Sequence, residues 1–263
     1  MHDDLVLRED QGAVSILTLN NPARLNALSD AMIAALSARF ADLGRATSQR
    51  VIVLRGAGKA FCAGHDLNEM RDKRAAPDKG AAALQDLFDR CAQMMQMIPQ
   101  LPQPVIAEVH GIATAAGCQL VASCDLAVAA QDCRFGVNGV NIGLFCSTPM
   151  VALSRNVGRK QAFEMLVTGE FINADHARTL GLVNRVVPPE TLGDHTAALA
   201  AQIAAKLGVA VRIGKRAFYD QLSLPLDQAY ALTGAVMVEN MLEPDTAEGV
   251  AAFLEKRSPG WRQ

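Results

Sequence analysis

The sequence lacks the features that would place the protein in a membrane or in a secretory pathway. No uninterrupted apolar run approaches the roughly 20 residues that a membrane-spanning helix needs, so no membrane span is expected. The acidic start, MHDDLVLRED, has neither the basic region nor the apolar segment of a secretory signal, and it is unlike an Arg-rich transit peptide. These absences predict a cytoplasmic protein.

Charge and cysteine usage exclude further classes. The 25 Lys and Arg residues against 27 Asp and Glu residues give a net charge of -2, without the basic surface of a nucleic-acid-binding protein. The six cysteines include no CxxC pair, so neither a zinc site nor a dithiol redox motif is indicated. We interpret them as buried free thiols, and we expect neither a metal nor a cofactor of the protein's own.

What the sequence does contain is an α/β pattern followed by a helical one. β-rich runs at 14–20 and 51–56 flank an apolar-periodic segment that Ser29 opens and Gly44 ends, and a second such segment covers 81–97. This alternation predicts an α/β fold. The last third reads as almost entirely helical, with helices at 151–168, 174–180, 191–207, 209–223 and 227–242. We therefore predict a core at 1–200 and a helical region at 201–263.

One stretch, His110 to Asp125, organises the rest of the chain. The strand-like PVIAEV leads into a turn of small residues, and a helix is expected from about Ala116 to Cys124. The first N–H groups of a helix have no internal partner and lie at the positive end of its dipole. Such an end suits an oxygen that carries or develops negative charge.

A second turn of the same kind runs from Phe61 to Leu67, with Asp66 placed to cap the following helix. If the two turns converge, the peptide N–H groups of His65 and Ala116 form an oxyanion hole. On the residues alone, close helix packing remains the competing explanation of the small residues.

Longer motifs resemble one family from end to end, the crotonase superfamily of enoyl-CoA hydratases and isomerases. They are NPARLNAL (21–28), VIVLRGAGKAFCAGHDL (51–67), PVIAEVHGIATAAGCQLVASCDLAVAA (104–130), FGVNGVNIGL (135–144), the run from Glu164 to Pro188, and FLEKRSPGW at the end. Within the superfamily, ATAAGCQLVASCD and GVNIGLFCSTP resemble most the branch named for an enoyl-CoA hydratase domain. The resemblance implies a spiral of ββα units with a C-terminal trimerisation region, in a homotrimer or a dimer of trimers.

The same resemblance implies an acyl-CoA thioester as ligand and assigns site residues. The oxyanion donors would be the N–H groups of His65 and Ala116. Lys256 would suit a phosphate of coenzyme A, contributed with Phe253 by a neighbouring subunit. The other positions implied near coenzyme A are Arg24, Leu25, Ala63, Asp66 and Leu67.

Two departures from the family pattern bear on the reaction. Hydratases of the family activate water with two glutamates, and the matching positions here are Gln119 and Gly139. Gln takes no proton at neutral pH and Gly has no side chain, whereas acid–base assistance contributes about 10²–10⁴ in rate. Two hypotheses therefore stay open: a lyase acting nominally on 2-enoyl-CoA, and an acyl-CoA-binding or regulatory protein that has lost the chemistry.

Several side chains near these motifs allow more than one interpretation. Gln119 either orients a water or a substrate carbonyl, or hydrogen-bonds within a polar pocket. His65 adds an imidazole base in one interpretation and only its peptide N–H in the other, which we favour. Asp125 is expected to be structural, and Cys146 to be a small core residue rather than a reactive thiol.

Overall fold

The computed structural model describes residues 4–261, and its centre is a six-stranded sheet. The strands are β1 (Val6–Gln11), β2 (Val14–Leu19), β3 (Val51–Gly56), β4 (Val105–Val109), β6 (Leu126–Ala130) and β9 (Arg185–Val187), in that spatial order. Only β1 is antiparallel to its neighbour; the other pairs are parallel. A smaller sheet joins β5 (Ile112–Thr114), β7 (Arg134–Gly136) and β8 (Ile172–Asn173). The α/β prediction is confirmed.

Strand β1 was not expected, because its sequence VLREDQ is mostly polar. It lies at the edge of the sheet, where only Val6 is buried and the other side chains reach solvent. A tight hairpin through Gly12, at φ +59°, pairs it with β2. A strand at the edge of a sheet needs at most one apolar face, so its composition only weakly predicts a strand.

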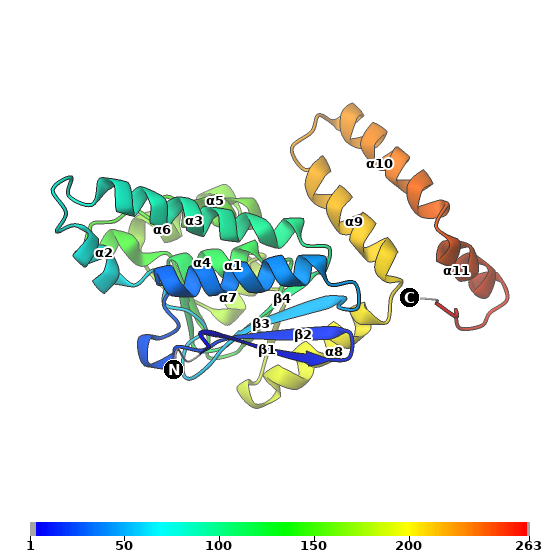
Figure 1. The fold of residues 1–263 in the computed structure, drawn as a ribbon, viewed down its shortest axis with the longest axis horizontal. Coiled ribbons are helices and arrows are strands. Elements are labelled where there is room, and N and C mark those ends of the chain that lie inside the picture. Colours follow the sequence, from blue (N-terminus) through cyan, green and yellow to red (C-terminus); the bar gives the residue numbers. More distant parts are fainter. Residues whose placement is uncertain (1–3, 262–263) are drawn as a thin grey trace.

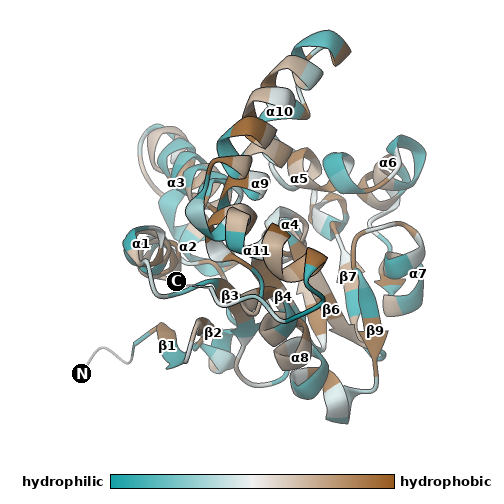
Figure 2. Cartoon of the chain, turned by 90° about the vertical axis from the view of Figure 1, so that its right-hand side faces the viewer, coloured by the Kyte–Doolittle hydropathy of each residue, from teal (hydrophilic) through white to brown (hydrophobic). Residues whose placement is uncertain are grey.

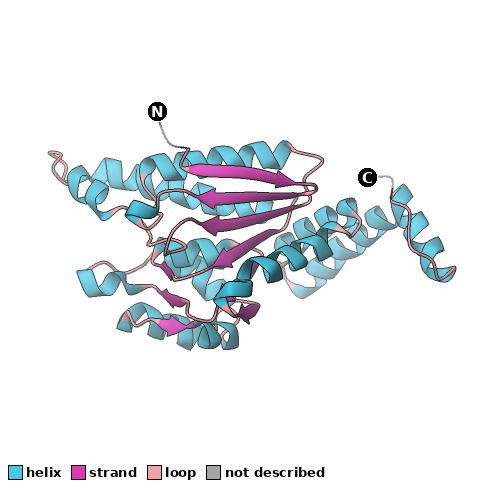
Figure 3. Ribbon diagram, turned by 90° about the horizontal axis from the view of Figure 1, so that it is seen from below, coloured by secondary structure: helices cyan, strands magenta, loops and turns pink. Residues whose placement is uncertain are grey.

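Helices cover both faces of the main sheet (Figures 1 and 3). Helix α1 (Asp30–Arg45) lies beside α3 (Ala81–Gln100) on one face, and α8 (Leu192–Ala204) packs on the other against β3, β4 and β6. The side chain of Ser29 accepts a hydrogen bond from the Met32 N–H, as expected of an N-cap. The buried face of α1 consists of Met32, Ile33, Leu36, Phe40 and Leu43.

Some helix boundaries differ from the prediction. The segment 151–168 is two helices, α5 (Pro149–Asn156) and α6 (Arg159–Thr168), because Val157 and Gly158 take extended or irregular backbone between them. Helix α3 continues through Pro99 and ends at Gln100, since Pro falls in its last turn. The remaining helices of the core are α2 (Leu67–Lys73), α4 (Ala116–Ser123), α7 (Ala174–Thr179), and the 3-10 turns η1 (Pro22–Arg24), η2 (Asn138–Ile142) and η3 (Pro189–Thr191).

Three helices project from the core as a C-terminal arm, residues 208–254 (Figure 1). They are α9 (Gly208–Gln221), α10 (Leu226–Met241) and α11 (Pro244–Leu254). A buried polar cluster attaches α9 to the core: the Lys215 ammonium donates to Ile98 O (2.8 Å), Gln103 O (2.8 Å) and Asp125 Oδ2 (2.7 Å). Asp125 also accepts from the Val105 N–H at 2.6 Å, so its expected structural role is confirmed.

The arm carries many exposed apolar side chains, and apolar segments run along its helices in Figure 2. These side chains are Phe218, Leu222, Leu226, Tyr230, Met237, Val238, Met241, Leu242, Phe253 and Leu254. Trimerisation through this region stays a prediction.

Between residues 4 and 261, no single helix is long and apolar enough to cross a bilayer. One pair of consecutive helical segments, Pro189–Ala204 and Gly208–Gln221, meets the length and composition criteria together, with a bend of 101° between them.

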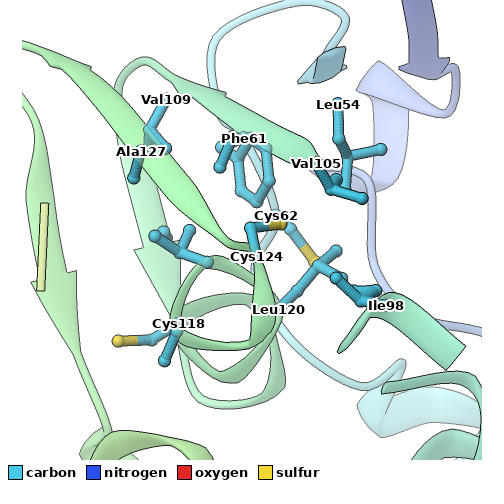
Figure 4. Packing of buried hydrophobic residues seen from close by; sticks show 14 of the residues in the cluster. Leu54, Phe61, Cys62, Ile98, Val105, Val109, Cys118, Leu120, Cys124 and Ala127 are labelled. Carbon is cyan, nitrogen blue, oxygen red and sulfur yellow. The ribbon is translucent and has the colours of Figure 1, made fainter. Parts of the chain in front are cut away.

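The six cysteines are free and buried, as predicted. Figure 4 shows Cys62 beside Phe61 in the core, among Ile98, Val105 and Leu120. The turn that begins at Phe61 is thereby anchored between the sheet and helices α3 and α4.

Candidate functional site

The two turns of small residues lie against each other. The Cys62 N–H donates to Ile112 O at 3.2 Å, and the Thr114 N–H donates to Cys62 O at 3.1 Å. A Cβ atom on Gly117 would lie 2.1 Å from Cys62 O. Only glycine permits so close an approach of helix α4 to the first turn.

The peptide units that precede His65 and Ala116 are also close. Gly64 has φ +89°, and a Cβ atom there would lie 2.9 Å from Ala115 Cβ and 3.2 Å from the Ala116 nitrogen. Neither the His65 N–H nor the Ala116 N–H donates a hydrogen bond to any atom of residues 4–261. The structure thus places the two turns together and leaves both amides unused; their convergence on one thioester oxygen stays a prediction.

The His65 side chain faces the interior. Its ring meets Phe88 edge-on with centroids 5.5 Å apart, and Nδ1 lies 3.4 Å from Leu28 O. Nε2 is buried and has no hydrogen-bond partner in the described part of the chain. Burial lowers the pKa of His65, so the imidazole is neutral at pH 7.

The residues assigned to coenzyme A in the core form one group beside the first turn. Arg24 Nη1 lies 2.6 Å from Asp66 Oδ2, and the Ala63 N–H donates to Leu25 O at 3.0 Å. Asp66 caps α2 through the Asn68 N–H at 2.9 Å, as expected. Burial raises the pKa of Asp66, but the hydrogen bonds from Arg24 and from the α2 amides outweigh it and lower that pKa. Leu67 follows on the surface, 53% exposed.

Asn26 holds this group in place, and the sequence interpretation did not single it out. It is fully buried with φ +54°. Its Nδ2 donates to Ala57 O (2.9 Å) and Ala60 O (2.8 Å), and its Oδ1 accepts from the Asn21 N–H at 2.9 Å. In the sequence, Asn26 is marked only by its place in the motif NPARLNAL. The neighbouring residues do not predict that its side chain binds the carbonyl groups of Ala57 and Ala60.

Gln119 and Gly139 are the two residues that the resemblance matches to the family's glutamates. Gln119 is 5% exposed, and its buried Oε1 has no partner among residues 4–261. A Cβ atom on Gly139 would lie 2.3 Å from Leu144 O and 2.9 Å from Cys146 Sγ. The loop therefore fills the space that a side chain at 139 would need.

Cys146 helps to close that loop. The Gly139 N–H lies 3.4 Å from Cys146 Sγ, and the Leu144 N–H donates to Gly139 O at 2.9 Å. Burial raises the pKa of the Cys146 thiol, which is therefore protonated at pH 7.

A cavity of about 1690 Å³ opens between α3, α4, α5 and the arm helices α9 and α10. Gln119 lines it, together with Ala122 and Ser123 further along α4, whereas His65 and Ala116 are not part of its lining. The cavity therefore reaches α4 one turn beyond the Ala116 amide.

Phe253 and Lys256 lie outside this region. Phe253 is 82% exposed on α11, and Lys256 follows that helix on the surface with φ +56°. Helix α11 lies at the far end of the arm, away from α2 in the core (Figure 1). Their contribution to a neighbour's coenzyme A site stays a prediction.

Comparisons with known proteins show the family of this chain. The enoyl-CoA hydratase/isomerase family model matches residues 9–263. The mitochondrial enoyl-CoA hydratase domain-containing protein 3 of Xenopus laevis is 45% identical over 260 residues, covering 99% of this chain and 87% of that protein. The human protein of that name is 44% identical over 245 residues, covering 93% of this chain and 79% of that protein.

Solved structures give the same result for the fold. The crystal structure of an enoyl-CoA hydratase from Mycobacterium smegmatis is 56% identical, with a TM-score of 0.95 over 99% of this chain and 100% of that one. That of human enoyl-CoA hydratase domain-containing protein 3 is 42% identical, with a TM-score of 0.93 over 98% of this chain and 100% of that one. The predicted crotonase fold and the resemblance to this branch are confirmed.

The predicted cytoplasmic location is wrong. The curated relatives from Xenopus laevis, zebrafish, mouse and human are all named mitochondrial. The prediction rested on the composition of the start of the chain, whose residues 1–3 lie outside the described range. The motifs, the fold and the match across residues 9–263 agree on one identification: this chain belongs to the enoyl-CoA hydratase/isomerase family.

Proposed function

We propose that the protein binds an acyl-CoA thioester and polarises its carbonyl with the peptide N–H groups of His65 and Ala116. The observation that carries this proposal is the close approach of Gly64 to the Ala116 nitrogen, where a Cβ atom on Gly64 would lie only 3.2 Å away, beside two amides without partners among the described residues. In a buried site, such donors stabilise charge that develops on a thioester oxygen. Coenzyme A arrives with the substrate, and the protein needs no cofactor of its own.

The nominal reaction is the hydration of a 2-enoyl-CoA, which would make the protein a lyase. A relative from Clostridium acetobutylicum, 31% identical, is named a short-chain-enoyl-CoA hydratase. Hydration by the usual route is impaired here, because Gln119 takes no proton and position 139 has no room for a carboxylate. The sealed loop at Gly139 therefore favours a second candidate, an acyl-CoA-binding or regulatory protein.

We also propose a homotrimer or a dimer of trimers. The exposed apolar side chains of the arm support it. In this assembly Phe253 and Lys256 complete a neighbour's coenzyme A site, next to Arg24, Leu25, Ala63, Asp66 and Leu67.

Binding of a thioester compared with its thioether analogue tests the role of the amides. Butyryl-CoA and butyl-CoA differ by one carbonyl oxygen, so we expect the thioester to bind about tenfold more tightly. An Ala116→Pro variant removes one N–H at the first position of α4, where no hydrogen bond within the helix is lost. It should lose most of that preference, as measured by titration calorimetry.

The matched control is Arg159→Pro, which changes the first residue of α6. It should keep the preference at similar thermal stability. Gly64→Ala serves as a second variant, since its Cβ would lie 3.2 Å from the Ala116 nitrogen. Equal affinity of the parent for both ligands would contradict the oxyanion proposal.

Turnover separates the two candidate functions. We expect crotonyl-CoA to lose its conjugated thioester absorbance about 10²–10⁴ more slowly than with a two-glutamate hydratase, if at all. Turnover at ordinary hydratase rates that survives Gln119→Ala would show that acid–base groups act from positions other than 119 and 139.

A further inference from the structure

Ala115, the single residue between β5 and α4, has a backbone conformation that L-amino acids rarely adopt. Its φ is +49° and its ψ is −120°. In a residue other than glycine this conformation is strained, and it persists only where the surrounding structure fixes it. Such residues cluster at active sites and ligand-binding sites. Ala115 directly precedes the Ala116 amide, so its strain needs a functional explanation.

Hydrogen bonds on both sides hold Ala115 in this conformation. Its N–H donates to Gly136 O at 2.9 Å, and its O accepts from the Gln119 N–H at 3.0 Å. The peptide bonds of the described residues are trans, so the Ala115 C=O and the Ala116 N–H lie in one plane and point in opposite directions. Because the C=O points along α4, the Ala116 N–H points out of the start of that helix.

Small residues surround the turn on both sides. Ala113, two residues before Ala115, is fully buried, and a Cβ atom on Gly117, two residues after it, would lie 2.1 Å from Cys62 O. A strained strand-to-helix turn between small residues is also found at the nucleophile of α/β-hydrolases. There the N–H of the residue after the nucleophile helps to form the oxyanion hole. The present chain has this kind of turn with alanine in place of a nucleophile.

The side chain of Ala115 lies between the two turns of the thioester site. A Cβ atom on Gly64 would lie 2.9 Å from Ala115 Cβ and 3.2 Å from the Ala116 nitrogen. Ala115 is partly exposed, so a ligand can reach its methyl group.

We propose that Ala115 is the positioning residue of the thioester site. Its strained turn directs the Ala116 N–H toward the carbonyl oxygen, and its own Cβ lies beside the carbonyl carbon. The proposal rests on the proposed function, because it requires a thioester at this amide. A methyl group cannot attack the thioester, so the site polarises the acyl group and leaves it attached to coenzyme A.

The first test changes the backbone preference at position 115. Valine is β-branched and disfavours a positive φ, whereas glycine adopts it freely. Ala115→Val should reduce the roughly tenfold preference for butyryl-CoA over butyl-CoA to about one, and the conservative Ala115→Gly should restore it. Lys79 is exposed and has φ +58°, so Lys79→Val is the matched control and should keep the preference. A general structural defect would weaken the binding of both ligands alike.

The second test places a nucleophile at the turn. In Ala115→Cys, the introduced thiolate attacks the carbonyl carbon of butyryl-CoA, the bond from that carbon to the coenzyme A sulfur breaks, and coenzyme A leaves as a thiol with the proton that the introduced thiol lost. The native cysteines are buried, so the parent should gain no butyryl group. We expect Ala115→Cys to be acylated about 10²–10³ faster than the exposed control Lys79→Cys. Mass spectrometry of the intact protein and of its peptides measures the rate and locates the group.

The outcomes distinguish this inference from the proposed function. If the parent prefers butyryl-CoA to butyl-CoA, acylation of Ala115→Cys no faster than that of Lys79→Cys overturns the inference alone. A tenfold preference that survives Ala115→Val also overturns it. Each test decides by itself if a variant of the other does not fold. If the parent shows no preference between the two ligands, the proposed function fails, and this inference fails with it.

Discussion

The ammonium of Lys215 lies 2.7 Å from Asp125 Oδ2, which ties the C-terminal arm to the end of helix α4. The Tyr219 hydroxyl donates to the other carboxylate oxygen at 2.7 Å. Lys215 and Asp125 are both largely buried, with side chains 6% and 12% exposed. Burial lowers the pKa of Lys215, while the charge of Asp125 opposes that shift. One polar cluster therefore holds α9 in contact with three parts of the core: helix α3, the first residue of β4, and the end of α4.

Breaking this cluster should loosen the arm. Lys215→Met leaves the Asp125 carboxylate buried without its counter-ion, and removing one partner of a buried pair typically costs about 3–5 kcal/mol. The neighbouring Arg216 is exposed and 3.6 Å from Asp220, so Arg216→Met should cost less than about 1 kcal/mol. Denaturant unfolding of the two variants measures the difference. Equal stability would show that the cluster does not hold the arm.

Restoring a side chain at 139 should destabilise the protein. Because a Cβ atom there meets Leu144 O at 2.3 Å, Gly139→Ala forces the loop to shift, at about 1–3 kcal/mol. Gly193 on α8 has nothing within 4 Å of its Cβ position, so Gly193→Ala should stabilise by about 0.5–1 kcal/mol. Thermal unfolding of the two variants measures whether each melting temperature falls or rises.

The double variant Gln119→Glu with Gly139→Glu extends that experiment to activity. We expect it to gain no crotonyl-CoA hydration, because the loop cannot present the second carboxylate. Hydration by a folded double variant would show that the loop opens to admit a side chain.

Stability should fall with rising pH above about pH 9. Burial raises the pKa to about 12 for the thiols of Cys62, Cys91, Cys118 and Cys133, against 9.0 for an unperturbed thiol. Between these values the unfolded chain has released the protons and the folded chain still holds them, so ionisation favours unfolding. Each thiol then lowers the free energy of unfolding by up to about 1.4 kcal/mol per pH unit.

Urea unfolding at about pH 8 and about pH 10 under a phosphine reductant measures this slope. The Cys118→Ala variant should have a slope smaller by one thiol. An unchanged slope in that variant would mean that Cys118 ionises alike in both states.

Replacing the Asn26 amide by a carboxylate should destabilise the protein. Asn26→Asp removes the Nδ2 donor and places negative charge against the carbonyls of Ala57 and Ala60. We expect a loss of about 2–4 kcal/mol and weaker butyryl-CoA binding, because Arg24 and Leu25 lie on the same turn. The side-chain amide of Asn20 donates only to Asp4 O, at 3.1 Å and in an exposed position, so Asn20→Asp is the matched control and should change both quantities little.

The sequence alone determined the features that depend on neighbours in the chain. The Ser29 and Asp66 caps, the α4 start at Ala116 and the helical last third all follow from local spacing, and the structure has them. The sequence likewise shows directly that neither position 119 nor position 139 carries a carboxylate. Free buried thiols followed from cysteine spacing.

Only the tertiary structure decided which distant atoms meet. It places Gly64 close to the Ala116 nitrogen and puts Leu144 O in the space that a side chain at position 139 would need. It also leaves Gln119 Oε1 without a hydrogen-bond partner among the described residues. It also gave Asn26 and Lys215 carbonyl partners from other elements. The distance between residues within one helix or turn is set by the covalent geometry of the backbone. The atoms that surround a given side chain belong to distant segments, and only the complete fold brings those segments together.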